Sequence, residues 1–132
     1  MTIKELCKLS HDMAVEKGFW DNTKIIPKRF LIEEKILLII TELAEAVEAL
    51  RKGRKQEFPE VRLKGHINKK DRNIIKKATS KLWLKDTFED EIADVFIRLG
   101  DMCEALGIDI EWQIKQKMSY NKTRPKKHGK EF

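Results

Sequence analysis

Two pairs of acidic residues are the part of this sequence with the clearest capacity for chemistry. Glu42 and Glu45 form an E-x-x-E pair, and Glu91 and Asp94 form an E-x-x-D pair. Residues three apart share one side of an α-helix, so each pair presents two carboxylates side by side. If both pairs converge, the repulsion among their charges requires a counter-charge. Mg²⁺, with Mn²⁺ as the alternative, prefers such oxygen ligands and binds phosphates readily. The pairs therefore predict a site for a metal-bound polyphosphate.

Two other interpretations of these pairs have to be weighed. Acidic pairs are common on solvated helix faces, and either pair alone carries little weight. A di-iron or di-manganese bundle normally also contains E-x-x-H motifs. The chain has 3 histidines, and none follows a glutamate by three residues. The residue types therefore disfavour a di-iron centre and leave the solvated acidic face as the alternative.

Two long helices are expected to position the acidic pairs, one over residues 27–52 and one over 86–106. A glycine stands just beyond each, as is typical of helix ends. The apolar stripe of the first helix comprises Ile36, Ile39, Ile40, Leu43, Val47 and Leu50. We expect the two helices to pack through Leu43 and Val47 against Ile92 and Val95. The acidic pairs would then meet at one edge of that contact.

Capping motifs mark where the other helices begin. Thr2 and Glu5 form a T-x-x-E capping box for a first helix, and Asp86 with Glu89 forms a similar arrangement. Asp109 is the expected cap of a last helix. No segment alternates convincingly between apolar and polar residues at a period of two. The fold class is therefore predicted to be all-α.

The predicted architecture is a helical bundle of four to five helices in a single domain, residues 1–132. Residues 53–85 are interpreted as a basic loop with a short helix at 69–81, and no role is assigned to them. Residues 124–132 are interpreted as a basic tail after the last helix.

Charge is distributed unevenly along the chain. Residues 51–81 carry 12 Lys and Arg against 3 Asp and Glu, and residues 115–132 carry 7 against 1. The rest of the chain is strongly acidic, although the whole has a net charge of +6. An acidic body with two basic segments suits an anionic ligand held near bound cations. Nucleic-acid binding through residues 51–81 and a structural oligomer without catalysis are the alternatives.

Composition indicates a protein of the cytoplasm with no membrane contact. The longest apolar run covers only residues 36–40, which is too short to span a bilayer. The opening residues MTIKELCKLS lack the apolar stretch of a signal peptide. Neither Cys7 nor Cys103 has a neighbour at metal-ligand spacing, so both are interpreted as reduced packing residues.

The combined motifs resemble those of the MazG-like all-α nucleoside triphosphate pyrophosphohydrolases, which include dCTPase-type and dimeric dUTPase-type enzymes. The matching stretches are ELAEAVEAL at 42–50 and EDEIADVFIRLGDMCEALGIDI at 89–110. The ending KQKMSYNKTRPKKHGKEF at 115–132 is similar to the family's K-x-x-x-N-x-x-R-P stretch. The resemblance covers 28–52 and 86–132, whereas 53–85 departs from the family's short loop.

This resemblance implies a Mg²⁺-dependent enzyme that converts nucleoside triphosphates, including deoxy or modified ones, to monophosphates and pyrophosphate. It implies that the metal ligands and catalytic acids are Glu42, Glu45, Glu91 and Asp94. It implies that the triphosphate or sugar is contacted by Lys117 and Asn121, with Arg124 nearby, and that the base pocket is lined by His11 and Trp20. It further implies a homodimer or homotetramer.

Overall fold

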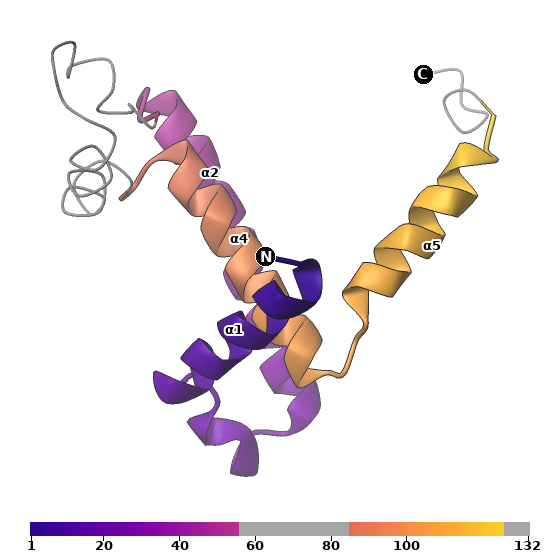
Figure 1. Cartoon of the computed structure of the whole chain (residues 1–132). Coiled ribbons are helices and arrows are strands. Elements are labelled where there is room, and N and C mark those ends of the chain that lie inside the picture. The colour runs from indigo at the N-terminus through magenta and orange to yellow at the C-terminus, as the bar shows by residue number, and fades with distance from the viewer. Residues whose placement is uncertain (56–84, 126–132) are drawn as a thin grey trace, which may run out of the picture. The chain divides into compact units, whose positions relative to one another are not determined.

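The computed structural model describes residues 1–55 and 85–125, without the side chains of Thr23 and Lys24. Its elements are α1 (Ile3–Glu16), the 3₁₀ turn η1 (Asp21–Lys24), α2 (Lys28–Arg51), α4 (Phe88–Ala105) and α5 (Ile110–Lys122) (Figure 1). All elements in the described ranges are helical, which confirms the all-α class for that part of the chain. The helix predicted at 69–81 and the tail beyond residue 125 lie outside the described residues.

The chain divides into two compact units, and the division falls inside α4. One unit is Arg29–Arg98, which holds α2 and the first half of α4. The other comprises Met1–Lys28 and Leu99–Phe132, which hold α1, η1, the second half of α4 and α5. The single domain expected from the sequence stays a prediction.

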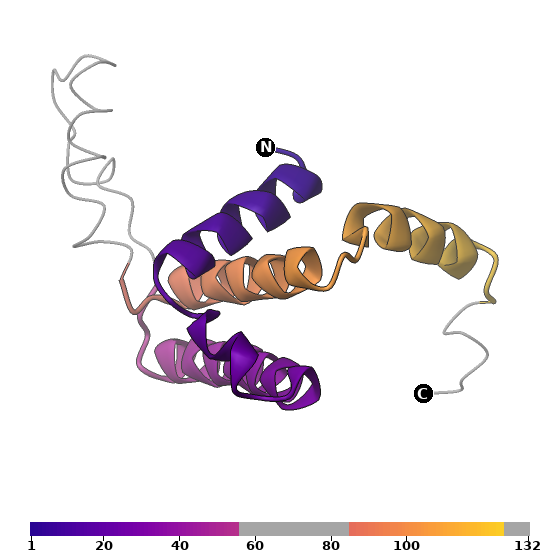
Figure 2. The same cartoon turned by 90° about the horizontal axis from the view of Figure 1, so that it is seen from below.

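In the unit Arg29–Arg98, α2 and the first half of α4 run side by side (Figures 1 and 2). The backbone N–H of Phe88, the first residue of α4, donates to the carbonyl oxygen of Arg54 at 3.1 Å. This bond ties the start of α4 to the segment that follows α2. The acidic pairs of the two helices therefore belong to the same unit.

The expected packing of α2 through Leu43 and Val47 is wrong. These side chains are 45% and 50% exposed, whereas Ala46 and Ala49 are buried. The buried positions of α2 form a different face from the apolar stripe, and this face also includes Leu31, Lys35 and Glu42. Small alanines let neighbouring backbones approach closely, so they can be buried at a helix contact although they contribute little apolar area. Glu42 shares this face and is consequently drawn inside.

In the other unit, α1 contacts α5, and its N-terminal half packs on α4. The predicted capping box is confirmed: Thr2 Oγ1 accepts from the Glu5 N–H at 3.1 Å, and Glu5 accepts from the Thr2 N–H at 2.7 Å. A Cβ added at Gly100 of α4 would lie 3.3 Å from the Cys7 Cα, so glycine permits this close approach. Cys7 and Cys103 are buried free thiols, as the sequence predicted.

The cap of α4 lies one residue later than expected. Thr87 precedes the helix, and its hydroxyl accepts from the Asp90 N–H at 3.3 Å. The carboxylate of Asp90 in turn accepts from the Asp86 N–H at 3.1 Å. Asp86 has a left-handed backbone with φ 61°, so it belongs to the preceding turn. The threonine hydroxyl thus takes the capping role that the sequence interpretation gave to Asp86.

The cap of α5 is where the sequence placed it. Asp109 accepts from the Trp112 N–H at 2.9 Å. The helix ends at Lys122, and the Arg124 N–H then donates to the carbonyl oxygen of Asn121. No helix in the described ranges is both long enough and apolar enough to cross a membrane.

Candidate metal centre

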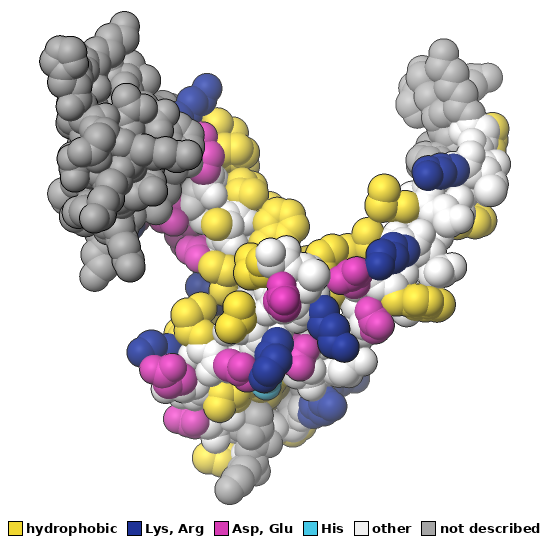
Figure 3. All heavy atoms as spheres, in the orientation of Figure 1, with side chains coloured by type: hydrophobic (Ala, Val, Ile, Leu, Met, Phe, Trp, Pro, Cys, Tyr) yellow, Lys and Arg dark blue, Asp and Glu magenta, His cyan; other side chains and the backbone are white. Residues whose placement is uncertain are grey.

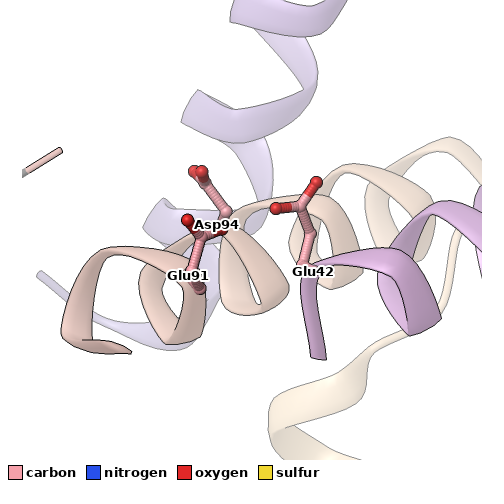
Figure 4. A group of neighbouring side chains, drawn as sticks. All are labelled: Glu42, Glu91 and Asp94. Atoms are coloured by element: carbon pink, nitrogen blue, oxygen red, sulfur yellow. The ribbon is translucent and has the colours of Figure 1, made fainter. Parts of the chain in front are cut away.

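Three acidic side chains from two helices converge in the unit Arg29–Arg98. Glu42 projects from α2, and Glu91 and Asp94 project from α4 (Figure 4). One carboxylate oxygen from each lies within 4.8 Å of the others. The structure therefore brings together members of both predicted acidic pairs, across a separation of about fifty residues in sequence.

Burial and mutual repulsion make this cluster electrostatically strained. Glu42 and Glu91 are only 5% and 7% exposed, while Asp94 is more exposed. Burial raises the pKa of Glu91 to about 7, with further contributions from its hydrogen bond to Glu42 and the charge of Glu45. Burial also raises the pKa of Asp94, helped by the charges of Asp90 and Glu42. Each shift opposes ionisation, so the cluster favours a proton or a cation.

Glu45, the fourth predicted acid, lies at the margin of the cluster. It is exposed on α2 and is not one of the three residues whose oxygens converge. Its negative charge nevertheless raises the pKa of both Glu91 and Asp94. Glu45 is therefore close enough to act on the centre electrostatically, and its role as a metal ligand stays a prediction.

Arg98 is a member of this cluster that the sequence interpretation missed. Its Nη2 forms an ion pair with Glu42 Oε1, and its side chain is 35% exposed. The Nε of Arg98 is buried and has no hydrogen-bond partner among the described residues. A signal was present in the sequence, because Arg98 follows Asp94 by four residues and so shares its side of α4.

The donor set suits a small divalent cation. Mg²⁺ takes oxygen ligands at about 2.0–2.1 Å, so oxygens on opposite sides of the ion are about 4 Å apart. The three carboxylate oxygens are already within 4.8 Å of one another. Only a small adjustment of these side chains would be needed to hold Mg²⁺ or Mn²⁺.

A second cluster joins residues of the other unit. Asp101, which is 5% exposed, accepts through Oδ1 from Trp20 Nε1 at 2.8 Å and from His11 Nδ1 at 2.8 Å. The His11 and Trp20 rings meet edge to face, with centroids 5.3 Å apart. The two residues predicted to line a base pocket are thus neighbours, positioned by a buried carboxylate that the sequence interpretation did not single out. Their contact with a base stays a prediction.

The predicted phosphate-binding residues lie at the C-terminal end of the described chain. Lys117 and Asn121 are exposed, four residues apart on one side of α5. Arg124 follows the end of the helix, so the shared helical face expected of the three residues extends only to the first two. The ammonium of Lys117 lies 5.3 Å from the centroid of the Tyr120 ring. Their role toward a triphosphate stays a prediction.

No family model, curated protein or solved structure matches this chain. The resemblance to the MazG-like pyrophosphohydrolases therefore stays a prediction from the sequence motifs.

Proposed function

We propose that this protein is a Mg²⁺-dependent nucleoside triphosphate pyrophosphohydrolase of the MazG-like kind, which releases pyrophosphate and a nucleoside monophosphate. The observation that carries the proposal is the convergence of Glu42 with Glu91 and Asp94. Two separate sequence motifs predicted this meeting, and a pair of unrelated solvated faces gives no reason to expect it. The raised pKa values of Glu91 and Asp94 also favour the binding of a cation.

In the proposed reaction, a water oxygen bonds to the α-phosphorus, and the bond from that phosphorus to the bridging oxygen breaks. Pyrophosphate leaves with the bridging oxygen. When bound, Mg²⁺ would neutralise phosphate charge and acidify a coordinated water. Glu42, Glu91 and Asp94 would hold the ion, and the exposed carboxylate of Glu45 would accept the proton from the attacking water.

The family resemblance assigns the remaining predicted residues to nucleotide binding, and their chemistry suits that role. Lys117 and Asn121 offer an ammonium and an amide, and Arg124 offers a guanidinium, all suited to phosphate oxygens and sugar hydroxyls. His11 and Trp20 offer planar rings for a base, held in place by Asp101. The chemistry of these groups supports a nucleotide over simple inorganic polyphosphate.

The proposal includes a homodimer or homotetramer, because α2 exposes a regular apolar stripe. Its members alternate at spacings of four and three, and each is at least 44% exposed: Ile36, Ile40, Leu43, Val47 and Leu50. This heptad pattern is typical of helices that pack against another helix. On α5, Figure 3 shows exposed hydrophobic side chains that alternate with basic ones. Analytical ultracentrifugation of the protein and of Leu43→Glu tests the assembly, and a monomeric unaltered protein would contradict it.

The test of the function is pyrophosphate release from a panel of ordinary, deoxy and modified nucleoside triphosphates, with Mg²⁺ and with Mn²⁺. Glu42→Gln and Asp94→Asn each remove a charged ligand, and metal ions contribute several kcal/mol to such reactions, so each should lose at least about 100-fold in rate. Glu34→Gln is the matched control, because Glu34 is exposed on α2 two turns before the cluster. Undiminished activity in both variants would disprove the metal assignment. Salt-dependent nucleic-acid binding without nucleotide turnover would favour a basic binding module instead.

A further inference from the structure

Arg98 places a fixed positive charge beside the proposed metal centre. Glu42 is one of the three converging carboxylates, and the Arg98 guanidinium occupies one of its oxygens. A guanidinium stays charged at all relevant pH values and cannot give up its position by losing a proton. A divalent cation bound by Glu42 would therefore lie close to this positive charge, which opposes its binding.

The guanidinium of Arg98 has donor capacity that its ion pair with Glu42 does not use. An arginine bound in the most favourable way donates two parallel hydrogen bonds to one carboxylate or phosphate. Here Nη2 meets Glu42, while the buried Nε has no partner among the described residues. A buried donor without a partner is costly, so a ligand that offered it an oxygen would be favoured. The side chain as a whole is 35% exposed, but Nε is buried, so a ligand would reach Nε only once the guanidinium has moved away from Glu42.

We propose that Arg98 is a built-in counter-ion that competes with the divalent cation for Glu42 and, once displaced, binds the phosphate groups of the incoming ligand. This inference rests on the proposed function, since it assumes that Glu42, Glu91 and Asp94 hold a cation. The two cations repel each other when both are close to Glu42. A phosphate brought by the metal offers the guanidinium a replacement for the carboxylate it has lost. Arg98 thereby couples metal binding to phosphate binding.

The first experiment measures Mn²⁺ binding without nucleotide, by the electron paramagnetic resonance signal of free Mn²⁺. Arg98→Gln removes the competing charge and should tighten Mn²⁺ binding roughly tenfold or more. Arg98→Lys keeps the charge and should bind Mn²⁺ like the unaltered protein. Arg29→Gln is the matched control, because Arg29 is on α2 and pairs with the exposed Glu33 at 2.9 Å. It lies 13 residues from Glu42, or roughly 20 Å along a helix, so its loss should leave Mn²⁺ binding unchanged.

The second experiment measures the binding of inorganic tripolyphosphate at saturating Mn²⁺, by calorimetry. Arg98→Gln should weaken this binding about tenfold, because two charge-assisted hydrogen bonds are lost. Arg98→Lys should also weaken it, since an ammonium cannot donate in the same paired fashion. The effects of Arg98→Gln on metal and on phosphate therefore have opposite signs. If the ion pair only stabilised the fold, Arg98→Gln should instead bind both Mn²⁺ and tripolyphosphate more weakly.

The outcomes separate this inference from the function on which it rests. Mn²⁺ binding by Arg98→Gln that is equal to or weaker than that of the unaltered protein would overturn the inference alone. Unchanged tripolyphosphate binding by the same variant would overturn it as well. Failure of the unaltered protein to bind Mn²⁺ would remove both the metal centre and the role of Arg98. Circular dichroism checks that each variant is folded. If Arg98→Gln unfolds, Arg98→Met takes its place, because methionine preserves the aliphatic stem.

Discussion

Replacing Glu91 by glutamine should stabilise the metal-free protein at neutral pH and greatly reduce its stabilisation by Mg²⁺. Glu91 is 7% exposed, and burial beside Glu42 and Glu45 raises its pKa to about 7. In the unfolded chain its pKa returns to the ordinary value near 4.5. The folded state therefore holds the proton more tightly than the unfolded state. Glutamine keeps a similar shape and hydrogen-bonding capacity but carries no titratable charge.

The sign and size of the effect follow from this difference in pKa. Below about pH 4.5 both states are protonated, and Glu91 costs no stability. As the pH rises toward 7 the unfolded state loses its proton first, so the free energy of unfolding of the unaltered protein falls. A difference of about 2.5 pKa units corresponds to about 3 kcal/mol, and partial solvent screening reduces this to about 1–3 kcal/mol. The advantage of Glu91→Gln should grow to that size between pH 4.5 and 7 and then level off.

The assay is urea denaturation from pH 4.5 to 8, in EDTA and in excess MgCl₂. Urea is preferred because guanidinium ions would screen the charges of the cluster. Mg²⁺ at a hundredfold excess over its Kd should stabilise the unaltered protein by about 2.7 kcal/mol. Glu91→Gln has lost a ligand and should gain far less, so Mg²⁺ should narrow or reverse its advantage. Glu34→Gln serves as the control, because Glu34 is exposed on the same helix as Glu42.

Two results would refute this reasoning. If the difference in unfolding free energy between Glu91→Gln and the unaltered protein stayed constant from pH 4.5 to 8, Glu91 would not be the strained acid described above. If Mg²⁺ stabilised both proteins equally, Glu91 would not be a ligand. A pH-dependent difference that Mg²⁺ leaves untouched would retain Glu91 as a buried acid and reject it as a ligand.

Three further predictions concern the scaffold around the proposed sites. Asp101→Asn removes the charged acceptor shared by Trp20 and His11, and should cost about 1–3 kcal/mol in urea denaturation; an unchanged midpoint would show that the cluster contributes nothing to stability. Gly100→Val places a side chain against the Cys7 backbone and should cost about 1–3 kcal/mol or more by the same assay; a stable variant would contradict the close approach of α1. Asp109→Ala removes the cap of α5 and should cost about 1 kcal/mol of helix stability, followed by circular dichroism, whereas Asp109→Asn should preserve it.

Local signals in the sequence were sufficient for the helices in the described ranges. Thr2 and Asp109 cap α1 and α5 as predicted, because a capping side chain bonds to backbone only three residues away. At the start of α4 the predicted cap, Asp86, was one residue too early, because Thr87 caps the helix instead. Both side-chain types can cap a helix, so the sequence did not separate them. Spacing of three residues also placed Glu91 and Asp94 side by side on one helix.

The orientation of α2 was the main failure of the sequence-based prediction. Hydrophobicity alone selected Leu43 and Val47 as the packing face, although the buried residues of that segment include Ala46 and Ala49. Helical periodicity shows which residues share a face but not which of two adjacent faces a partner covers. Which face is covered depends on how closely the backbone of the partner helix can approach. This distance depends on the side chains of both helices.

By itself, the sequence determined the helical class, the helix ends and the presence of two acidic pairs, because each depends on residues within about one helical turn. The tertiary structure decided which acids meet: it joined Glu42 to Glu91 and Asp94, left Glu45 exposed at the margin and added Arg98. It also placed Asp101 between His11 and Trp20. These contacts span tens of residues, and the packing of whole helices fixes them. Spacing along one helix can therefore name the candidate residues, but it cannot decide which of them meet.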